Sequence, residues 1–214
     1  MSVTPPSVMP SATLREVVGL DGTPPRLGGD TVLIMIDFQQ TYRTGVMALE
    51  GAEAALEAGA RLLAAARAAG SPVVHIVNDG GPDTPYDIRA DIGSISREVA
   101  PRDGEPVVVK QVPNAFHATG LEETLRELGA GADLVFAGFM THMCVTFTAQ
   151  GAFNLGYRPT VVAEATATRS LPAFDGSPVS AATLQSASLA TIGDLFGLVV
   201  PTVGDLSAPE AVSP

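Results

Sequence analysis

Short apolar runs alternate with helical patterns along most of this chain. Six runs have the length of buried strands, at residues 32–36, 73–77, 107–109, 134–137, 160–163 and 198–200. Helical patterns lie between them, at residues 50–69, 120–128, 142–155 and 180–195. Continuous apolar strands that alternate with helices are typical of a parallel sheet covered on both faces. With right-handed crossovers, the pattern predicts a doubly wound α/β domain with three layers, α/β/α.

The two ends of the chain depart from this pattern. Residues 1–30 contain five prolines and no apolar period, and the last residues look similar. We therefore predict an irregular Pro-rich N-terminal arm at 1–30, a single domain at 31–200 and a C-terminal tail at 201–214. The Gly-, Pro- and Asp-rich stretch 78–105 is expected to form a functional loop region with short helical pieces.

Composition and charge limit which binding partners and which cellular compartment we expect for this protein. Apolar residues make up 46% and charged residues 16% of the chain, which suits a compact globular protein. The net charge of −11 argues against nucleic acid and membrane surfaces as partners. No run is long enough to span a bilayer, and the first residues lack the basic and apolar regions of a secretory signal. Because a single free cysteine suits a reducing compartment, we predict a cytoplasmic protein.

Three reactive side chains stand at predicted strand ends. Asp37 closes the first run, Lys110 closes the third, and Cys144 follows the fourth, at the start of a helical pattern. In doubly wound folds the site lies beyond the carboxyl ends of the strands. A thiol, a carboxylate and an ammonium that converge there indicate a nucleophile, its base and a stabilising cation. Each residue alone also has an ordinary explanation: a core cysteine, a capping aspartate, a solvated lysine.

These residues lie in segments that resemble the isochorismatase-like cysteine hydrolases. The segments are TVLIMIDFQQTY, VVVKQVPNAFHATGLEETLRELG and LVFAGFMTHMCVTFTAQGAFNLGYRPTVVAEATAT, and the resemblance runs from about residue 31 to 200. It implies a six-stranded parallel sheet of order 3-2-1-4-5-6 and a catalytic triad of Asp37, Lys110 and Cys144. It also implies a cis peptide bond between Phe139 and Met140, an oxyanion hole formed by the N–H groups of Met140 and Cys144, and assembly into a homo-oligomer, a dimer or tetramer.

Two departures from relatives in this family refine the expected chemistry. Nicotinamidases of the family bind a metal through an Asp-x-His pair and a further histidine after the second strand, whereas this chain has His75, His117 and His142 far apart. We therefore expect no metal and no cofactor, and we expect His75 to be a core residue. True isochorismatases lack the cysteine, so its presence favours hydrolysis of a C–N bond through a thioester.

The predicted function is hydrolysis of a small-molecule amide or cyclic amide (lactam). The segments GFMTHMCV and HIVNDGG resemble the branch that includes streptothricin hydrolase, which opens a lactam. The alternatives are a vinyl ether hydrolase that uses Asp37 and Lys110 without the cysteine, and a catalytically silent binding protein on the same scaffold. The candidate walls of the substrate pocket, with ordinary core packing as the alternative for the aromatic ones, are Phe38, Tyr42, Asn114, Phe116 and His142.

Overall fold

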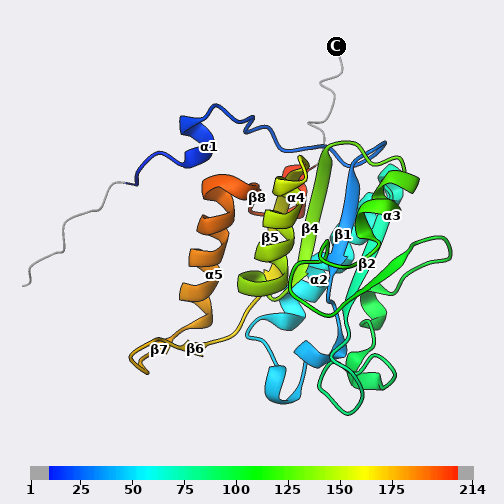
Figure 1. Ribbon diagram of the computed structural model, residues 1–214, viewed down its shortest axis with the longest axis vertical. Helices are drawn as coiled ribbons and strands as arrows, with labels where there is room; N and C mark the ends of the chain where they lie inside the picture. Colours follow the sequence, from blue (N-terminus) through cyan, green and yellow to red (C-terminus); the bar gives the residue numbers. More distant parts are fainter. Residues whose placement is uncertain (1–9, 207–214) are drawn as a thin grey trace, which may run out of the picture.

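A six-stranded parallel sheet forms the centre of the molecule (Figure 1). The structure is a computed structural model that describes residues 10–206. The sheet has the order β3-β2-β1-β4-β5-β8. Since β8 is its sixth strand, this confirms the predicted order 3-2-1-4-5-6. The strands are β1 (Val32–Ile36), β2 (Val73–Asn78), β3 (Val107–Lys110), β4 (Asp133–Phe139), β5 (Arg158–Ala167) and β8 (Leu198–Val200).

Helices cover both faces of the sheet, which confirms the three-layer α/β/α class. Helix α2 (Ala52–Ala69) lies behind the sheet in Figure 1, and α3 (Leu121–Glu127), α4 (Thr146–Asn154) and α5 (Ala181–Thr191) lie in front of it. Strand β1 is buried at every position: Leu33 and Met35 belong to the core on the α2 side, and Val32, Ile34 and Ile36 to the core on the other side. Burial on both faces explains why the strand is apolar throughout rather than alternating.

Some elements differ from the prediction. Strand β5 extends well beyond the predicted residues 160–163. Its later residues pair with β4 after a register shift between Phe136 and Gly138, but they are mixed in polarity, so the apolar pattern did not include them. A small hairpin of β6 (Leu171–Pro172) and β7 (Pro178–Val179) was not expected. Each strand has only two residues, which is too short for a periodic pattern to be detected in the sequence.

Within residues 10–30, the predicted arm forms the short helix α1 (Leu14–Val17). Thr13 and Glu16 form a capping box at its start. This sequence pattern is typical of a helix start, but the many prolines of the arm had favoured an irregular structure. The backbone N–H of Leu14 donates to Asp194 Oδ1 at 2.9 Å, so this part of the arm packs against the end of the α5 segment of its own chain. Residues 1–9 of the predicted arm and 207–214 of the predicted tail lie outside the described residues. In the described part of the chain, no helix is long and apolar enough to cross a membrane.

The loops that follow the strands gather at the carboxyl edge of the sheet, at the bottom of Figure 1. Short 3-10 turns lie there, at Gln40–Tyr42, Gly45–Met47, Asp91–Gly93 and Arg97–Val99. Arg89 fastens the long loop after β2 by pairing with Asp79 at 2.7 Å and with Asp87 at 2.6 Å. His75, in β2, is 1% exposed, as expected for a core histidine.

Candidate active site

Three side chains meet beyond the carboxyl ends of β1, β3 and β4. Asp37 directly follows β1, Lys110 is the last residue of β3, and Cys144 lies in a π-helical turn, Thr141–Val145, that follows β4. The Lys110 Nζ atom lies 2.7 Å from Asp37 Oδ2 and 3.2 Å from Cys144 Sγ. The structure therefore brings together the three residues that the sequence analysis selected.

The strand order explains why a long side chain is needed at position 110. Strands β1 and β4 are neighbours, but β2 separates β3 from β1. Lys110 is in register with Asn78, the last residue of β2, and its Nζ donates to Asn78 Oδ1 at 3.1 Å. The lysine thus crosses the end of β2 to reach Asp37. Asn78 was not among the predicted site residues, although its place directly after the second apolar run was an available signal.

Close approach of β4 to β1 requires a glycine. Gly138 has φ +133°, and a Cβ built there would lie 1.8 Å from the carbonyl oxygen of Ile36. No side chain fits at that distance, and L-residues rarely adopt that φ. Gly138 is also paired in register with Ile36, the residue before Asp37. It therefore sets the spacing between the strand that ends at Asp37 and the strand that leads to Cys144.

Asp37 and Lys110 form a buried ion pair, with both side chains 0% exposed. Burial raises the pKa of Asp37, and the neighbouring Lys110 ammonium opposes that change. For Lys110, burial alone would lower the pKa, but the negative charge of Asp37 opposes this and the pKa is raised. Lys110 is therefore protonated at neutral pH. The Asp37 carboxylate thus lies beside both the Lys110 ammonium and the Cys144 thiol, where it can accept the thiol proton.

The Cys144 thiol is protonated in the resting site. The residue is 6% exposed, and burial followed by the charge of Asp37 raises its pKa well above the ordinary value, while Lys110 acts in the opposite direction. A place near the start of a helix by itself favours a thiolate. Burial beside a carboxylate outweighs that contribution here. The thiol proton must therefore leave as the sulfur attacks, and the Asp37 carboxylate is the neighbouring acceptor.

The chain between β4 and Cys144 makes an unusual connection. It contains the cis peptide bond between Phe139 and Met140 that the family resemblance implied. The carbonyl oxygen of Met140 accepts the N–H groups of Met143 at 3.0 Å and Val145 at 3.2 Å, which closes the π-helical turn. Met140 is 7% exposed. The predicted oxyanion hole, formed by the N–H groups of Met140 and Cys144, stays a prediction.

Two predicted pocket aromatics, Phe38 and Tyr42, lie in the core on the α2 side of the sheet. The Phe38 ring fills the space beside Gly59 of α2, where an added Cβ would lie 2.6 Å from the ring. Tyr42 packs edge-to-face on Tyr86, with ring centroids 5.8 Å apart. Burial, followed by the charge of Asp37, raises the pKa of Tyr42 well above 10, so its ring lies close to the triad. Phe38 is therefore a core residue rather than a wall of the substrate pocket, whereas Tyr42 packs in the core and also borders the reactive groups.

Asn114 and Phe116 pack along α4. The Asn114 side chain lies against Gly151 of that helix, and its Oδ1 accepts the N–H of Phe116 at 2.9 Å. The Phe116 ring stacks on Tyr157 at a centroid distance of 6.0 Å. Tyr157 follows the end of α4 that is remote from Cys144, so the structure does not bring Phe116 to the triad. Spacing along the sequence had suggested a wall residue, but helix packing turns the ring away.

His142 connects the π-helical turn to the end of β5. Its Nδ1 and Thr168 Oγ1 share a hydrogen bond of 2.5 Å. Burial, followed by the charge of Arg169, lowers the pKa of His142, which is therefore neutral at pH 7. Thr168 and Arg169 were not among the predicted site residues. The predicted apolar run ended at residue 163, so no sequence signal marked these two residues as the first after the strand.

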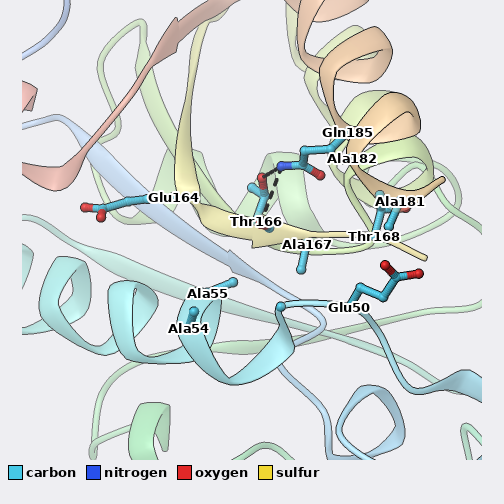
Figure 2. A pocket seen from close by; sticks show the side chains of 11 residues that line it. Glu50, Ala54, Ala55, Glu164, Thr166, Ala167, Thr168, Ala181, Ala182 and Gln185 are labelled. Atoms are coloured by element: carbon cyan, nitrogen blue, oxygen red, sulfur yellow. Dashed lines mark hydrogen bonds between the residues drawn. The ribbon is translucent and has the colours of Figure 1, made fainter. Parts of the chain in front are cut away.

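Besides a hollow of about 520 Å³ among the 3-10 turns at Gln40–Tyr42, Asp91–Gly93 and Arg97–Val99, two hollows open at this edge of the sheet. One, of about 350 Å³, lies between the start of α2, the end of β5 and the start of α5, where Gln185 donates to Thr166 Oγ1 at 2.8 Å (Figure 2). The other, of about 370 Å³, is mainly apolar and borders Met143, the residue before Cys144. The residues that line the second hollow are Val112, Pro113, Asn114, His117, Met143 and Phe147.

Residues 10–206 contain no group of three or more His, Cys, Asp and Glu side chains arranged to hold a metal ion. The predicted absence of a metal site stays a prediction.

The chain is similar to several known proteins over most of its length. It is 34% identical to the secreted isochorismatase effector Isc1 of Verticillium dahliae, over 84% of this chain and 93% of that protein. It is 33% identical to a streptothricin hydrolase of Streptomyces noursei, over 83% of this chain and 66% of that protein, and 36% identical to the maleamate amidohydrolase of Pseudomonas putida, over 64% and 72%.

A solved structure and a family match agree with these relatives. The crystal structure of an isochorismatase from Pseudomonas putida KT2440 superposes with a TM-score of 0.85 at 38% identity, covering 92% of this chain and 99% of the other. The isochorismatase domain matches residues 31–200. With this fold, these relatives and a domain match over most of its length, the chain belongs to the isochorismatase family.

Proposed function

We propose that this protein is a cysteine-dependent hydrolase that cleaves a C–N bond other than a peptide bond, in a small-molecule amide or lactam. One observation carries the proposal: the Lys110 ammonium lies between the Asp37 carboxylate, at 2.7 Å, and the Cys144 sulfur, at 3.2 Å. The named activities of two relatives, streptothricin hydrolase and maleamate amidohydrolase, support the bond class.

The first half of the proposed reaction forms an acyl-enzyme. Asp37 takes the proton of the Cys144 thiol as the sulfur attacks the amide carbonyl, and a C–S bond forms. The N–H groups of Met140 and Cys144 hold the oxyanion of the tetrahedral intermediate, and each such donor lowers a barrier of this kind by about 2.7–4 kcal/mol. The C–N bond then breaks, Asp37 returns its proton to the departing nitrogen, and a thioester remains.

The second half restores the enzyme. Asp37, again a carboxylate, takes a proton from a water molecule that attacks the thioester, and the C–S bond breaks. The thiol recovers the proton, and a carboxylic acid leaves. Lys110 stays protonated throughout, because its raised pKa keeps it charged beside whichever anion is present. Asn78 holds the lysine nitrogen in place through its 3.1 Å hydrogen bond.

Conversion of Cys144 to serine tests the role of the nucleophile. We expect turnover to fall by at least about a thousandfold, with an unchanged circular dichroism spectrum, because triad residues act as a unit. The assay follows ammonia or amine release from maleamate, ureidoacrylate, nicotinamide and streptothricin. Wild-type activity in the Cys144→Ser protein refutes the proposed mechanism.

Two further measurements separate the alternatives. Alkylation of the single cysteine by iodoacetamide stops the proposed reaction, whereas a vinyl ether hydrolase that uses Asp37 and Lys110 alone keeps its activity towards isochorismate. Intact-mass detection of an acyl-enzyme distinguishes the proposal from a silent binding protein. Assembly into a dimer or tetramer and a cytoplasmic location stay predictions; one relative is named a secreted effector.

A further inference from the structure

Gln39 continues the pairing of β1 with β2 beyond the point where β1 ends. The chain turns out of β1 at Asp37, which has a φ of 51°, and the N–H of Gln39 donates to the carbonyl oxygen of Asp37 at 2.7 Å. The Gln39 side chain is 0% exposed and lies against Asn78, the last residue of β2. Its Oε1 accepts the N–H of Asn78 at 2.9 Å, and its Nε2 donates to the carbonyl oxygen of Asn78 at 3.0 Å. The side-chain amide thus supplies both bonds that a neighbouring strand would make with Asn78.

The same amide also holds the long loop that follows β2. Its Nε2 donates a second hydrogen bond, of 2.8 Å, to the carbonyl oxygen of Gly93. Close by, the N–H of Ser96 donates to the carbonyl oxygen of Phe38 at 2.8 Å, so the loop pairs with the segment that carries Gln39. Both N–H groups and the oxygen of the buried amide are therefore used, which fixes it in one orientation. The backbone of Asn78 is held from that side.

The side chain of Asn78 is one of three acceptors around the Lys110 ammonium. Asn78 and Lys110 are in register between β2 and β3, and the Lys110 Nζ lies 3.1 Å from Asn78 Oδ1. The same nitrogen lies 2.7 Å from Asp37 Oδ2 and 3.2 Å from Cys144 Sγ. Because an ammonium has three N–H donors, three acceptors define one position for the nitrogen. Two of these acceptors are the reactive groups, and Asn78 is the neutral one.

We propose that Gln39 and Asn78 are positioning residues: Gln39 fixes Asn78, which holds the Lys110 ammonium at the reactive groups as a neutral third acceptor. This inference rests on the proposed cysteine mechanism and adds two residues that act through the lysine. A carboxylate at position 78 would hold the nitrogen equally well, but its charge would oppose the negative charge that develops on the Cys144 sulfur. The neutral amide supplies the position without that repulsion.

A double-mutant cycle tests whether Gln39 acts through Asn78. We expect Gln39→Met and Asn78→Ala each to lower kcat by about ten- to a hundredfold, the range of a hydrogen bond to a charged group. KM should stay within about threefold, and the double substitution should be no slower than Asn78→Ala alone. The assay follows amine or ammonia release from maleamate, ureidoacrylate, nicotinamide and streptothricin. Gln40→Met, at the partly exposed neighbouring residue, is the matched control and should behave as wild type.

The substitution Asn78→Asp separates positioning from packing, because it keeps the size and the acceptor but adds a charge. We expect alkylation of Cys144, the single cysteine, by iodoacetamide at pH 8 without substrate to slow by about tenfold or more. The added carboxylate makes the thiolate, which is the reactive form, less favourable. Asn154→Asp makes the same change at an exposed residue at the end of α4, and it should be alkylated at the wild-type rate.

Three results would overturn the inference. Equal alkylation rates in the wild type and Asn78→Asp would exclude the role of a neutral acceptor, and wild-type kcat in Asn78→Ala would exclude positioning by Asn78. A double substitution that loses the product of the two single losses would show that Gln39 acts independently. If Gln39→Met gives no folded protein by circular dichroism, Gln39→Asn, which keeps the amide on a shorter side chain, takes its place in the cycle. Wild-type turnover in Cys144→Ser would instead refute the proposed mechanism, while the alkylation rates would still report how Asn78 affects the sulfur.

Discussion

Glu105 holds the chain that enters β3, the strand that delivers Lys110. Its carboxylate accepts two hydrogen bonds of 2.7 Å from Arg67 of α2, one of 2.9 Å from the N–H of Arg102, and lies 3.1 Å from His75 Nε2. Its side chain is 13% exposed. Burial opposes ionisation, but these hydrogen bonds outweigh it and lower the pKa of Glu105 from 4.5 to about 2.

The difference between the pKa of Glu105 in the folded chain and its ordinary value sets how much this residue contributes to folding stability. At about 1.36 kcal/mol per pKa unit, it corresponds to about 3 kcal/mol of folding free energy at neutral pH. Because the pKa is lower in the folded state, the contribution is complete above pH 4.5 and is lost as the pH falls from 4.5 towards about 2. Glu105→Gln removes the charge, so the substituted protein should be less stable at pH 7 by about 2–3 kcal/mol.

Urea unfolding at pH 7 and at pH 3 measures the effect. The difference in unfolding free energy between the wild type and Glu105→Gln should be about 2 kcal/mol smaller at pH 3 than at pH 7. At pH 3 Glu105 is mostly protonated in the unfolded chain but mostly ionised in the folded chain, so part of its stabilising contribution is lost. Glu53→Gln is the control: its ion pair with Arg43 is 2.7 Å long but its side chain is 62% exposed, so the cost should stay below about 1 kcal/mol. A gap for Glu105→Gln that is equal at both pH values would refute the reasoning.

Three further predictions concern the site. Lys110→Met should lower kcat/KM by at least about a thousandfold, measured as amine release, because Asp37 and Cys144 lose the cation that contacts both. A loss below tenfold would contradict its role. Gly138→Ala should give little folded protein by circular dichroism, since a Cβ there would lie 1.8 Å from the Ile36 carbonyl oxygen; a well-folded variant would show that the strands can separate. The acid limb of the kcat/KM profile should lie above pH 3.8, because the raised pKa of Asp37 removes the base as the pH falls; a limb below that value would exclude Asp37 as the base.

The fold class, and the meeting of Asp37, Lys110 and Cys144, could be predicted from the sequence because both follow from the order of elements along the chain. Six apolar runs separated by helical patterns predicted the layered sheet, since strands buried on both faces need continuous apolar residues. A parallel sheet places the carboxyl ends of its strands at one edge. Residues directly after those runs, such as Asp37 and Lys110, could therefore be selected without coordinates.

Only the tertiary structure decided contacts between segments far apart in sequence. Asn78 supports Lys110 because β2 and β3 are in register, and Phe116 turns away because it packs along α4 towards Tyr157. The charge state of Cys144 depends on its burial beside a carboxylate, which no local pattern reports. A sequence determines which residues reach the edge of the sheet, but their pKa values and partners depend on desolvation and distance, which exist only once the chain has folded.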